Sequence, residues 1–460
     1  MIISFSGRKS AGKTTLANEL QKDGFVKISF ASELKRLVSV LYGWEISDLS
    51  NTIKKEEILT VPAIWDKDKA RQLESIIGAS RRLDCAQRSF KTRREVLQYV
   101  GTDILRKYDS EFHVNSIKKQ ILPNTNYVLD DVRFLNELNL LRKLGAHCIY
   151  VMRPYFFDDY SNHRSEIELN RTHFSHLLLN NRDVKHLVKK FRGFKKLILS
   201  PKRAGNIDRE TLTRLFKKYK TTKTISKHLK CSRDKVVWWA GKHLIPISRN
   251  EYKLDESVFL SVNKESAYWA GLLSADGCIK RVRKYNYVLE FANTDKELID
   301  GFCRFFTTDK KPYSHEQRVK DGFKRCWLMT INSPYVIDDM KLWNLEPRKS
   351  RHNKVPDCVK DNDDLFNPWL VGLIDGDGCI CITKSKQVII RVLASLEIIN
   401  FIHNRFPKGK IYSEKGIKNL YAIQYNGKNA VELYREIYSG VGLKRKWNKV
   451  VPFLKKNWLH

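Results

Sequence analysis

Two short segments of this sequence end in the same acidic residue and could together hold a divalent cation. The segment AYWAGLLSADGCI at 267–279 returns as PWLVGLIDGDGCI at 368–380, which places Asp276 and Asp377 101 residues apart. A single Asp-Gly pair after a helix is usually an ordinary turn. Two such pairs in matching contexts favour a shared cation site, because Mg²⁺ prefers the oxygens of carboxylates, water and phosphate.

The residues before each aspartate predict how the two carboxylates would meet. Small residues recur four positions apart, Gly271 and Ala275 in the first copy and Gly372 and Gly376 in the second. Residues at this spacing lie on one face of a helix, and the distance between packed helices follows the size of the side chains at the contact. The sequence therefore predicts two helices whose backbones approach unusually closely.

The glycine after each aspartate is expected to end its helix. Gly277 and Gly378 suit the left-handed conformation that often follows a helix. Asp276 and Asp377 would then emerge side by side, each at the negative end of a helix dipole, which costs about 0.3–1 kcal/mol. Their mutual repulsion adds to this cost, so the arrangement suits a cation site.

The N-terminal segment carries a second chemical pattern, GRKSAGKT at 7–14, directly after the apolar run at 2–5. In such loops glycines let backbone amides surround a phosphate, the lysine reaches the β- and γ-phosphates, and the hydroxyl can hold Mg²⁺. A second apolar run at 127–129 ends in Asp130-Asp131, and Asp131 is placed to hold magnesium-bound water. The candidate ATP-binding residues of the loop are Gly7, Gly12, Lys13, Thr14 and Thr15, with Thr14 as a metal ligand.

Three regions are expected to position these residues, which agrees with a chain of 460 residues. Residues 1–200 alternate apolar runs with amphipathic helical stretches, as α/β domains do. Residues 203–250 read as short helices with a turn. Residues 251–460 hold a duplicated domain with copies at about 260–355 and 362–455.

The net charge of +34 predicts a polyanionic partner, because neutralising phosphates releases counterions. The positive charge is densest in residues 201–250, with 14 basic residues against 3 acidic ones. Nine cysteines without a CxxC pair argue against a zinc ribbon or a secreted disulfide framework. No run approaches the roughly 20 apolar residues of a membrane span, and no signal peptide opens the chain. We expect a cytoplasmic protein with no membrane partner.

The motifs WAGLLSADG at 269–277 and LVGLIDGDG at 370–378 resemble the LAGLIDADG homing endonucleases in their single-chain, two-motif form, over about 200 residues. The resemblance implies an α+β fold with an αββαββα repeat, present twice, whose sheets form a saddle in the major groove of double-stranded DNA. It also implies one cut on each strand by a monomer with internal pseudo-symmetry. Asp276 and Asp377 would bind Mg²⁺, which activates water. Ser274 departs from the acidic residue of the pattern, at a position that is not the metal ligand.

Both copies end in a basic tail, LEPRKS at 345–350 and LKRKWN at 443–448. Lys349 and Lys446 could stabilise the charge that develops on the reacting phosphate, and an equally good interpretation makes them surface lysines that face phosphates. The strand-like stretches expected to contact DNA are 287–291, 325–331, 388–393 and 421–425.

The central segment 208–247 resembles the small helix-turn-helix modules found beside many homing endonucleases. Ile225 and Leu229 form an apolar step, and Ser232 is a plausible N-cap for a second helix. That recognition helix would contact DNA through Arg233, Lys235 and Trp238. The alternative is a basic helical linker.

Residues 1–200 resemble phage-type deoxynucleoside monophosphate kinases, an α/β P-loop fold. This implies transfer of the ATP γ-phosphate to a deoxynucleoside monophosphate, with Arg106, Arg133 and Arg153 clamping phosphates. The alternative is a domain that folds without turnover. The matching pieces are FASELKRLV (30–38), LQYVGTDILR (97–106), LDDVRFLNE (129–137), VMRP (151–154) and HRSE (163–166).

The combined interpretation is a kinase-like domain, a helix-turn-helix and a two-repeat endonuclease, encoded by a phage or similar mobile DNA. One alternative is a bifunctional protein whose main activity is nucleotide phosphorylation. Another is an RNA-binding maturase that assists intron splicing. An intein is not expected, because the chain ends in NWLH without the His-Asn of a splice junction.

Overall fold

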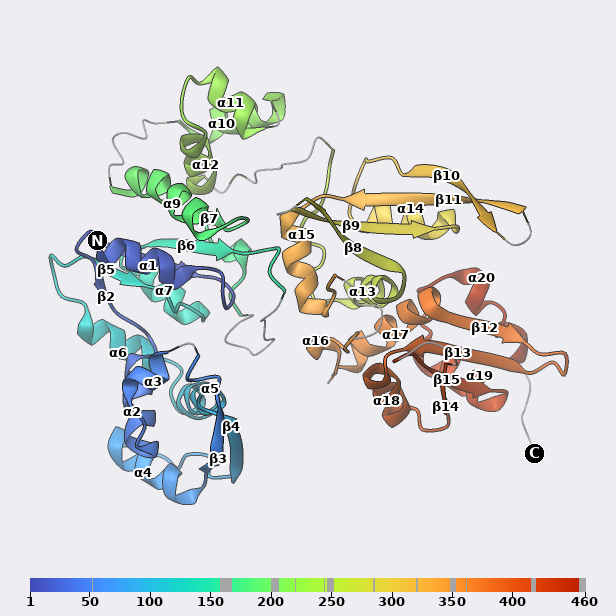
Figure 1. Ribbon diagram of the computed structural model, residues 1–460, viewed down its shortest axis with the longest axis horizontal. Helices are drawn as coiled ribbons and strands as arrows, with labels where there is room; N and C mark the ends of the chain where they lie inside the picture. The colour runs from blue at the N-terminus through green and yellow to red at the C-terminus, as the bar shows by residue number, and fades with distance from the viewer. Residues whose placement is uncertain are drawn as a thin grey trace. The chain divides into compact units, whose positions relative to one another are not determined.

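The computed structural model describes residues 1–51, 53–157, 168–199, 207–219, 221–243, 245, 252–283, 286–319, 322–347, 353–360, 362–414 and 419–454. These residues form two compact units (Figure 1). The first comprises residues 1–153 and the described residues between 168 and 245, and the second comprises residues 154–157 and the described residues from 252 onward. No described helix is long and apolar enough to cross a membrane.

A five-stranded parallel sheet in the order β2-β5-β1-β6-β7 forms the centre of the first unit. Every residue of β1 is buried, as expected for a parallel strand that is covered on both faces. The strands are β1 (Ile2–Ser6), β2 (Val26–Lys27), β5 (Tyr127–Leu129), β6 (His147–Met152) and β7 (His176–Leu179), and the helices beside them are α1 (Lys13–Gln21), α7 (Leu135–Lys143), η2 (Arg171–His173) and α9 (Val184–Leu199).

A second core lies in the same unit, where Trp65, Val96 and Tyr99 are buried together. Within this lobe η1 is a π-helix. Such helices are rare in proteins, and those that occur are often found at functional sites. The elements of the lobe are α2 (Ser32–Tyr42), α3 (Ile46–Ser50), β3 (Ile58–Trp65), α4 (Lys67–Ile77), β4 (Arg88–Thr92), α5 (Arg93–Gln98), η1 (Tyr99–Arg106) and α6 (Phe112–Gln120).

Three short helices complete the first unit: α10 (Arg209–Tyr219), α11 (Thr222–His228) and α12 (Arg233–Lys242). Residues of α12 share one hydrophobic core with β1, α1 and α9. The basic segment is therefore part of the folded first unit.

The second unit contains two similar halves, each with a four-stranded antiparallel sheet. The sheet orders, β10-β11-β9-β8 and β14-β15-β13-β12, are the same when the strands of each half are numbered from its first. The first half contains α13 (Lys264–Asp276), β8 (Gly277–Arg283), β9 (Asn286–Asn293), α14 (Lys296–Phe305), β10 (Tyr313–Val319), β11 (Gly322–Ile331), α15 (Pro334–Asp339) and η4 (Met340–Trp343). The second contains α16 (Asp357–Lys360), α17 (Asp363–Asp377), β12 (Gly378–Ile382), β13 (Val388–Ala394), α18 (Leu396–Arg405), β14 (Lys410–Ser413), β15 (Tyr421–Asn426), α19 (Lys428–Ile437), α20 (Lys444–Trp447) and η5 (Val451–Phe453).

Residues 154–157, which follow β6 in the chain, pack within the second unit. The ring of Tyr155 stacks on that of Tyr287 with 5.7 Å between their centroids, and its hydroxyl donates to Asn286 Oδ1 at 3.2 Å. Phe157 contacts the same tyrosine ring.

The two halves meet along α13 and α17, whose backbones touch. A Cβ added at Gly271 would lie 1.9 Å from the carbonyl oxygen of Trp369, and one at Gly372 would lie 2.0 Å from that of Tyr268. A Cβ at Gly376 would lie 2.3 Å from Ala275 Cβ. No side chain larger than hydrogen fits at these distances, so the predicted close packing is confirmed.

The expected conformation of the glycines after the helices was wrong. Gly277 has φ −78° and ψ 150°, and Gly378 has φ −96° and ψ 159°, so both are extended and begin β8 and β12. Their Cβ atoms would instead lie 2.7 Å from the carbonyl oxygen of Leu273 and 2.5 Å from that of Ile374. Glycine is needed here because the strand turns back against the last turn of its own helix.

Gly372→Ala should destabilise the second unit by about 3 kcal/mol or more, because the new methyl group overlaps a backbone carbonyl that cannot rotate away. Calorimetry of the full chain should show the loss in one of its thermal transitions. Gly301→Ala in α14 is the matched control, because its Cβ would meet side chains alone, the Trp269 ring at 3.3 Å and Arg304 Nη2 at 3.6 Å. Equal stability of the two variants would contradict the close contact.

Candidate functional site

The ends of α13 and α17 bring the two predicted aspartates to one place. Asp276 and Asp377 are the last residues of their helices, and they directly follow Ala275 and Gly376, which touch. Asp377 is exposed and Asp276 is half-buried. Asn293, the last residue of β9, donates from Nδ2 to Asp276 Oδ2 at 3.1 Å. This arrangement places two carboxylates at the negative ends of two helix dipoles.

Lys446 lies against the end of α17. Its Nζ donates to the carbonyl oxygens of Asp375 at 2.6 Å, Gly378 at 2.9 Å and Ile374 at 3.1 Å. Burial lowers the pKa of Lys446, while the negative charges of Asp375 and Asp276 oppose that shift. The ammonium group therefore caps the helix and adds positive charge close to the carboxylates. The predicted counterpart, Lys349, lies outside the described residues.

Asp375 is a structural residue of this site that the sequence interpretation passed over. It is 3% exposed. Its Oδ2 accepts from Tyr268 Oη at 2.9 Å and from the backbone N–H of Leu443 at 2.7 Å, and its Oδ1 accepts from Trp447 Nε1 at 2.9 Å. Burial raises the pKa of Asp375. The carboxylate therefore connects α13 and α17 to α20, the helix that carries Lys446.

The corresponding position in the first half uses different chemistry. Ser274 accepts from Asn353 Nδ2, at 3.1 Å on Oγ and 2.8 Å on its carbonyl oxygen. The departure at Ser274 therefore marks an asymmetry between the halves. An acidic residue within the apolar stretch 368–376 was the signal that could have identified Asp375.

A cation at the two helix ends would need further oxygens. The described residues contain no group of three or more His, Cys, Asp or Glu side chains that could hold a metal ion. Asp276 and Asp377 could supply two carboxylates, and water or phosphate oxygens would complete the coordination.

The loop after β1 forms the second candidate site, and its glycines have clear structural reasons. Gly7 has φ +133°, and its Cβ would lie 2.1 Å from the carbonyl oxygen of Val151. Gly12 has φ +103° and precedes α1. Lys13 Nζ donates to the carbonyl oxygens of Gly7 at 2.6 Å and Arg8 at 2.8 Å, which holds it across the loop.

The first residues of α1 follow this loop. Thr14 is exposed and Thr15 is half-buried. The N-terminus of a helix favours negative charge because its free N–H groups and its dipole point at the ligand. The loop and α1 could therefore bind phosphate.

Asp131 lies beside this loop, because β5 is the sheet neighbour of β1 and the carboxyl ends of parallel strands share one edge. Its Oδ2 accepts from Ser29 Oγ at 2.6 Å and from the backbone N–H of Ala31 at 3.0 Å. Its Oδ1 is buried and has no hydrogen-bond partner among the described residues. A free carboxylate oxygen in this position fits a water molecule held by Mg²⁺.

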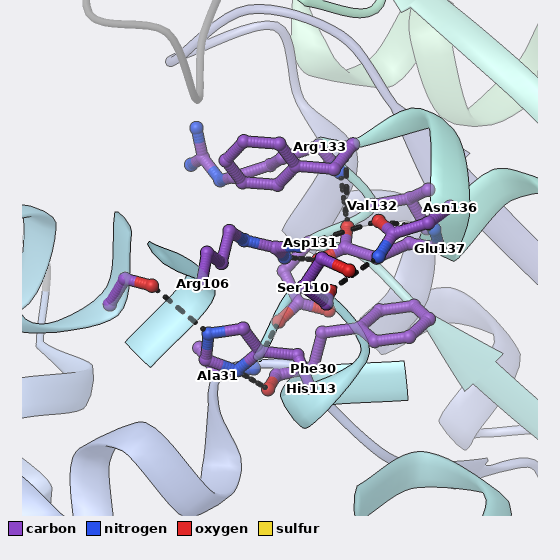
Figure 2. Close-up of polar contacts among 12 residues, drawn as sticks. Phe30, Ala31, Arg106, Ser110, His113, Asp131, Val132, Arg133, Asn136 and Glu137 are labelled. Carbon is purple, nitrogen blue, oxygen red and sulfur yellow. Dashed lines mark hydrogen bonds and ion pairs between the residues drawn. The ribbon is translucent and has the colours of Figure 1, made fainter. Parts of the chain in front are cut away.

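The π-helix η1 delivers Arg106 to the same region, as Figure 2 shows. Its guanidinium lies 3.6 Å from the centroid of the Phe134 ring and forms an ion pair with Glu137. Glu137 Oε2 accepts from the backbone N–H groups of Arg133 at 2.8 Å and Phe134 at 3.1 Å. Burial raises the pKa of Glu137 to about 7, against the effect of Arg106. Glu137 therefore fixes one predicted arginine and the backbone of another.

Arg153 and His113 complete the surroundings. Arg153 Nη1 donates to the carbonyl oxygen of Ser10 at 3.1 Å, so the third predicted arginine contacts the loop between β1 and α1. His113 lies between the carbonyl oxygens of Phe30 at 3.2 Å and Gly101 at 3.3 Å (Figure 2). Burial lowers the pKa of His113 to about 4, so it is neutral and holds η1 in place. The predicted motif at 163–166 lies outside the described residues.

The prediction that Trp238 contacts DNA was wrong. Its side chain is 5% exposed and stacks on His176 of β7, with 4.6 Å between ring centroids and 7° between ring planes. A buried ring cannot reach DNA bases. Of the other two predicted residues, Arg233 is exposed and Lys235 is half-buried.

Two families match parts of the chain. Residues 46–191 match the model of the deoxynucleotide monophosphate kinases, and residues 263–333 match the model of the LAGLIDADG-like domain. The phosphate-binding loop precedes the first match, and the motif at 370–378 follows the second.

Relatives were found for both regions. The "Putative deoxynucleotide monophosphate kinase" of Acanthamoeba polyphaga mimivirus is 29% identical over 201 residues, which cover 40% of this chain and 90% of the relative. The intron-encoded RNA maturase bI4 of Saccharomyces cerevisiae is 34% identical over 99 residues, which cover 21% of this chain and 15% of the relative.

The chain is also similar to two solved structures of low sequence identity. The homing endonuclease I-WcaI bound to its DNA recognition sequence has a TM-score of 0.34 and 16% identity, covering 41% of this chain and 87% of its own. I-GzeII in complex with its DNA target has a TM-score of 0.29 and 14% identity, covering 42% and 91%. From the family models, the chain combines a deoxynucleotide monophosphate kinase-like domain with a LAGLIDADG-like domain that follows it.

Proposed function

We propose that the second unit is a site-specific endonuclease that cuts both strands of DNA with the help of a divalent cation. The observation that carries the proposal is the joint ending of α13 and α17 on Asp276 and Asp377, each of which leads directly into a sheet. Two similar halves suit the two antiparallel strands of a duplex. Because one chain carries both halves, it can act as a monomer.

Asp276 and Asp377 would hold the cation, which we expect to be Mg²⁺. When bound, the cation would lower the pKa of a water molecule and stabilise the departing oxygen. Asn293 orients the Asp276 carboxylate, and Lys446 supplies positive charge toward the reacting phosphate. Two carboxylates at two negative helix ends are unfavourable alone, so a cation stabilises the arrangement that the glycine contact enforces.

The sheets offer suitable side chains for contacts with DNA. Exposed basic residues occur on β8, β11 and β14, and exposed aromatic residues on β10, β11 and β14. Basic side chains neutralise phosphates, and aromatic ones contact bases or sugars. Exposed residues of these kinds include Lys280, Arg281, Arg283, Tyr313, Phe323, Lys324, Arg325, Lys410 and Tyr412.

The first unit supports a second activity, the transfer of phosphate from ATP to a deoxynucleoside monophosphate. Two observations favour this activity. Asp131 Oδ1 has no hydrogen-bond partner among the described residues, and Lys13 Nζ donates to a carbonyl oxygen of the neighbouring loop. Lys13 and Thr14 would bind the phosphates and Mg²⁺ of ATP. Arg106, Arg133 and Arg153 would bind phosphate oxygens, since bidentate guanidinium groups suit them. The name of the mimivirus relative agrees with this activity.

An RNA-binding role in splicing is a further candidate because of the match to the maturase bI4. That match covers 15% of the relative. The presence of Asp276 and Asp377 favours DNA cleavage over RNA binding alone. Sequencing the DNA ends left after digestion of genomic DNA would identify a cleavage site and test the endonuclease directly.

Asp276→Asn and Asp377→Asn should each abolish double-strand cutting while DNA binding persists, because each removes one charge that holds the cation. Agarose gels of a supercoiled plasmid with the mapped site separate uncut, nicked and linear DNA. If one of the single variants still nicks the plasmid, that result agrees with two sites that each cut one strand. Asp364→Asn, at the other end of α17, is the control. Full cutting by the double variant would disprove the assignment.

Asp375→Asn should reduce cleavage at least about tenfold and change DNA affinity little. An amide would turn an N–H group toward one of three donors, which weakens the attachment of α20 and displaces Lys446. Cleavage rates of D375N, K446A and the double variant form a cycle. We expect the double variant to be no slower than K446A. Additive losses would mean that Asp375 does not act through Lys446.

Lys13→Ala should eliminate ATP-dependent phosphorylation of deoxynucleoside monophosphates and leave DNA cleavage unchanged. The reason is that Lys13 belongs to the loop of the first unit alone. A coupled assay with each of the four monophosphates measures this, with Lys22→Ala as a control of equal charge. Unchanged phosphorylation in K13A would contradict the ATP site.

A further inference from the structure

We infer that α10, α11 and the turn after α11 bind the phosphate backbone of DNA, and that α12 anchors these helices to the first unit without reading bases. This inference deepens the proposed function and rests on its choice of DNA as the partner. It reverses the usual roles in a helix-turn-helix, where the second helix enters the major groove.

The surroundings of α12 leave it little surface for DNA. It packs against α9 and β7 on one side and against α10 and α11 on the other (Figure 1). Trp238 stacks on His176 and also contacts Phe194, with 5.4 Å between centroids. Trp239 is 3% exposed. Both indole rings are therefore used for packing.

The beginning of α12 is also engaged. A Cβ added at Gly193 of α9 would lie 2.8 Å from Asp234 Oδ2, so the first turn of α12 lies against α9. Arg233 Nε donates to Thr222 Oγ1 at 2.9 Å. A helix that reads the major groove must expose one face, with several side chains free to reach base edges. In the first turn of α12 Arg233 and Asp234 are exposed, whereas Lys235 and Val237 are half-buried and Val236 is buried.

The outer surface of α10 and α11 has the opposite character. Leu212, Leu215 and Ile225 are buried toward α12 and the rest of the core. The basic side chains on the other side are exposed: Arg214, Lys217, Lys218, Lys223, Lys227 and Lys230. Lys223 and Lys227 are four residues apart and share one face of α11.

These basic side chains have no acidic partners in the part of the chain that the structure describes. Among the described residues, none of the six forms an ion pair, whereas the neighbouring α9 pairs Lys195 with Asp23 at 2.5 Å and Arg192 with Glu19 at 3.2 Å. Like charges close together on a helix destabilise it. An uncompensated cluster of this kind fits an external polyanion, and double-stranded DNA is the polyanion on which the second unit is proposed to act.

The test compares two full-length triple variants in an Asp276→Asn, Asp377→Asn background that cannot cut. One is K223Q/K227Q/K230Q. The control is K107Q/K119Q/K143Q, which removes the same charge from three exposed lysines elsewhere in the first unit. Binding to a DNA duplex with the cleavage site, to a random DNA duplex and to an RNA duplex of the same random sequence is titrated at 50 and 200 mM salt, and melting curves verify folding.

Affinity falls as salt rises, and each lost phosphate contact should make the negative slope of log affinity against log salt shallower by about 0.9, or by about 2.7 for three contacts. The ratio of the affinity of the unsubstituted chain to that of the variant should therefore fall about 40-fold from 50 to 200 mM salt. Both duplexes should be affected equally, because phosphates carry no sequence information. The control variant should change the slope by less than 1.

Three results would overturn the inference: a slope equal to that of the control variant, a loss confined to the cleavage-site duplex, or a larger loss with an RNA duplex than with DNA. The second would indicate base reading, and the third a different nucleic acid. The random duplex requires no cleavage site, so failure of the endonuclease proposal is distinguishable. If the unsubstituted chain never cuts DNA but the variant shows the slope change, only the endonuclease proposal fails. If the unsubstituted chain cuts DNA and the variant shows no slope change, only the phosphate-binding inference fails.

Discussion

The contact between the backbones of α13 and α17 is the constraint on which the second unit depends. Gly271 and Gly372 face the carbonyl oxygens of the opposite helix at distances that no side chain tolerates. This contact fixes the separation of the two sheets, since each begins at the residue after its helix. It also brings Asp276 and Asp377 together despite their repulsion. Helix packing here supplies the free energy that holds a charged site in an unfavourable geometry.

A buried polar network extends this constraint to α20. Asp375 joins Tyr268 of one helix to Leu443 and Trp447 beside the other. A carboxylate that is buried with three donors is costly to disturb, because each freed donor loses its partner away from water. The result is a fixed ammonium group at a helix end. In the first unit Glu137 has the same role, since it orients Arg106 through a buried carboxylate.

The sequence allowed the helix pair, several strands of the two sheets and the glycine-containing loop between β1 and α1 to be predicted because each depends on local spacing. Gly271 and Gly372 were recognisable from a four-residue interval. Gly277 was misassigned, because a glycine needed for space and one needed for positive φ look identical in a sequence. Trp238 was misassigned for another reason: periodicity indicates which face of a helix is apolar and not which element covers it. Asp375 depended on contacts with residues about 70 and 107 positions away.

Residues 154–157 affect how such a chain can be divided. Tyr155 and Phe157 lie within the sequence of the kinase-like region, and yet their rings pack in the second unit against Tyr287. No single cut in the chain yields two pieces that each contain a whole unit. A fragment that ends near residue 250 carries two aromatic rings without their cover, and one that begins there has an exposed Tyr287. Recombination that separated the two regions would therefore remove the contacts among these three aromatic rings.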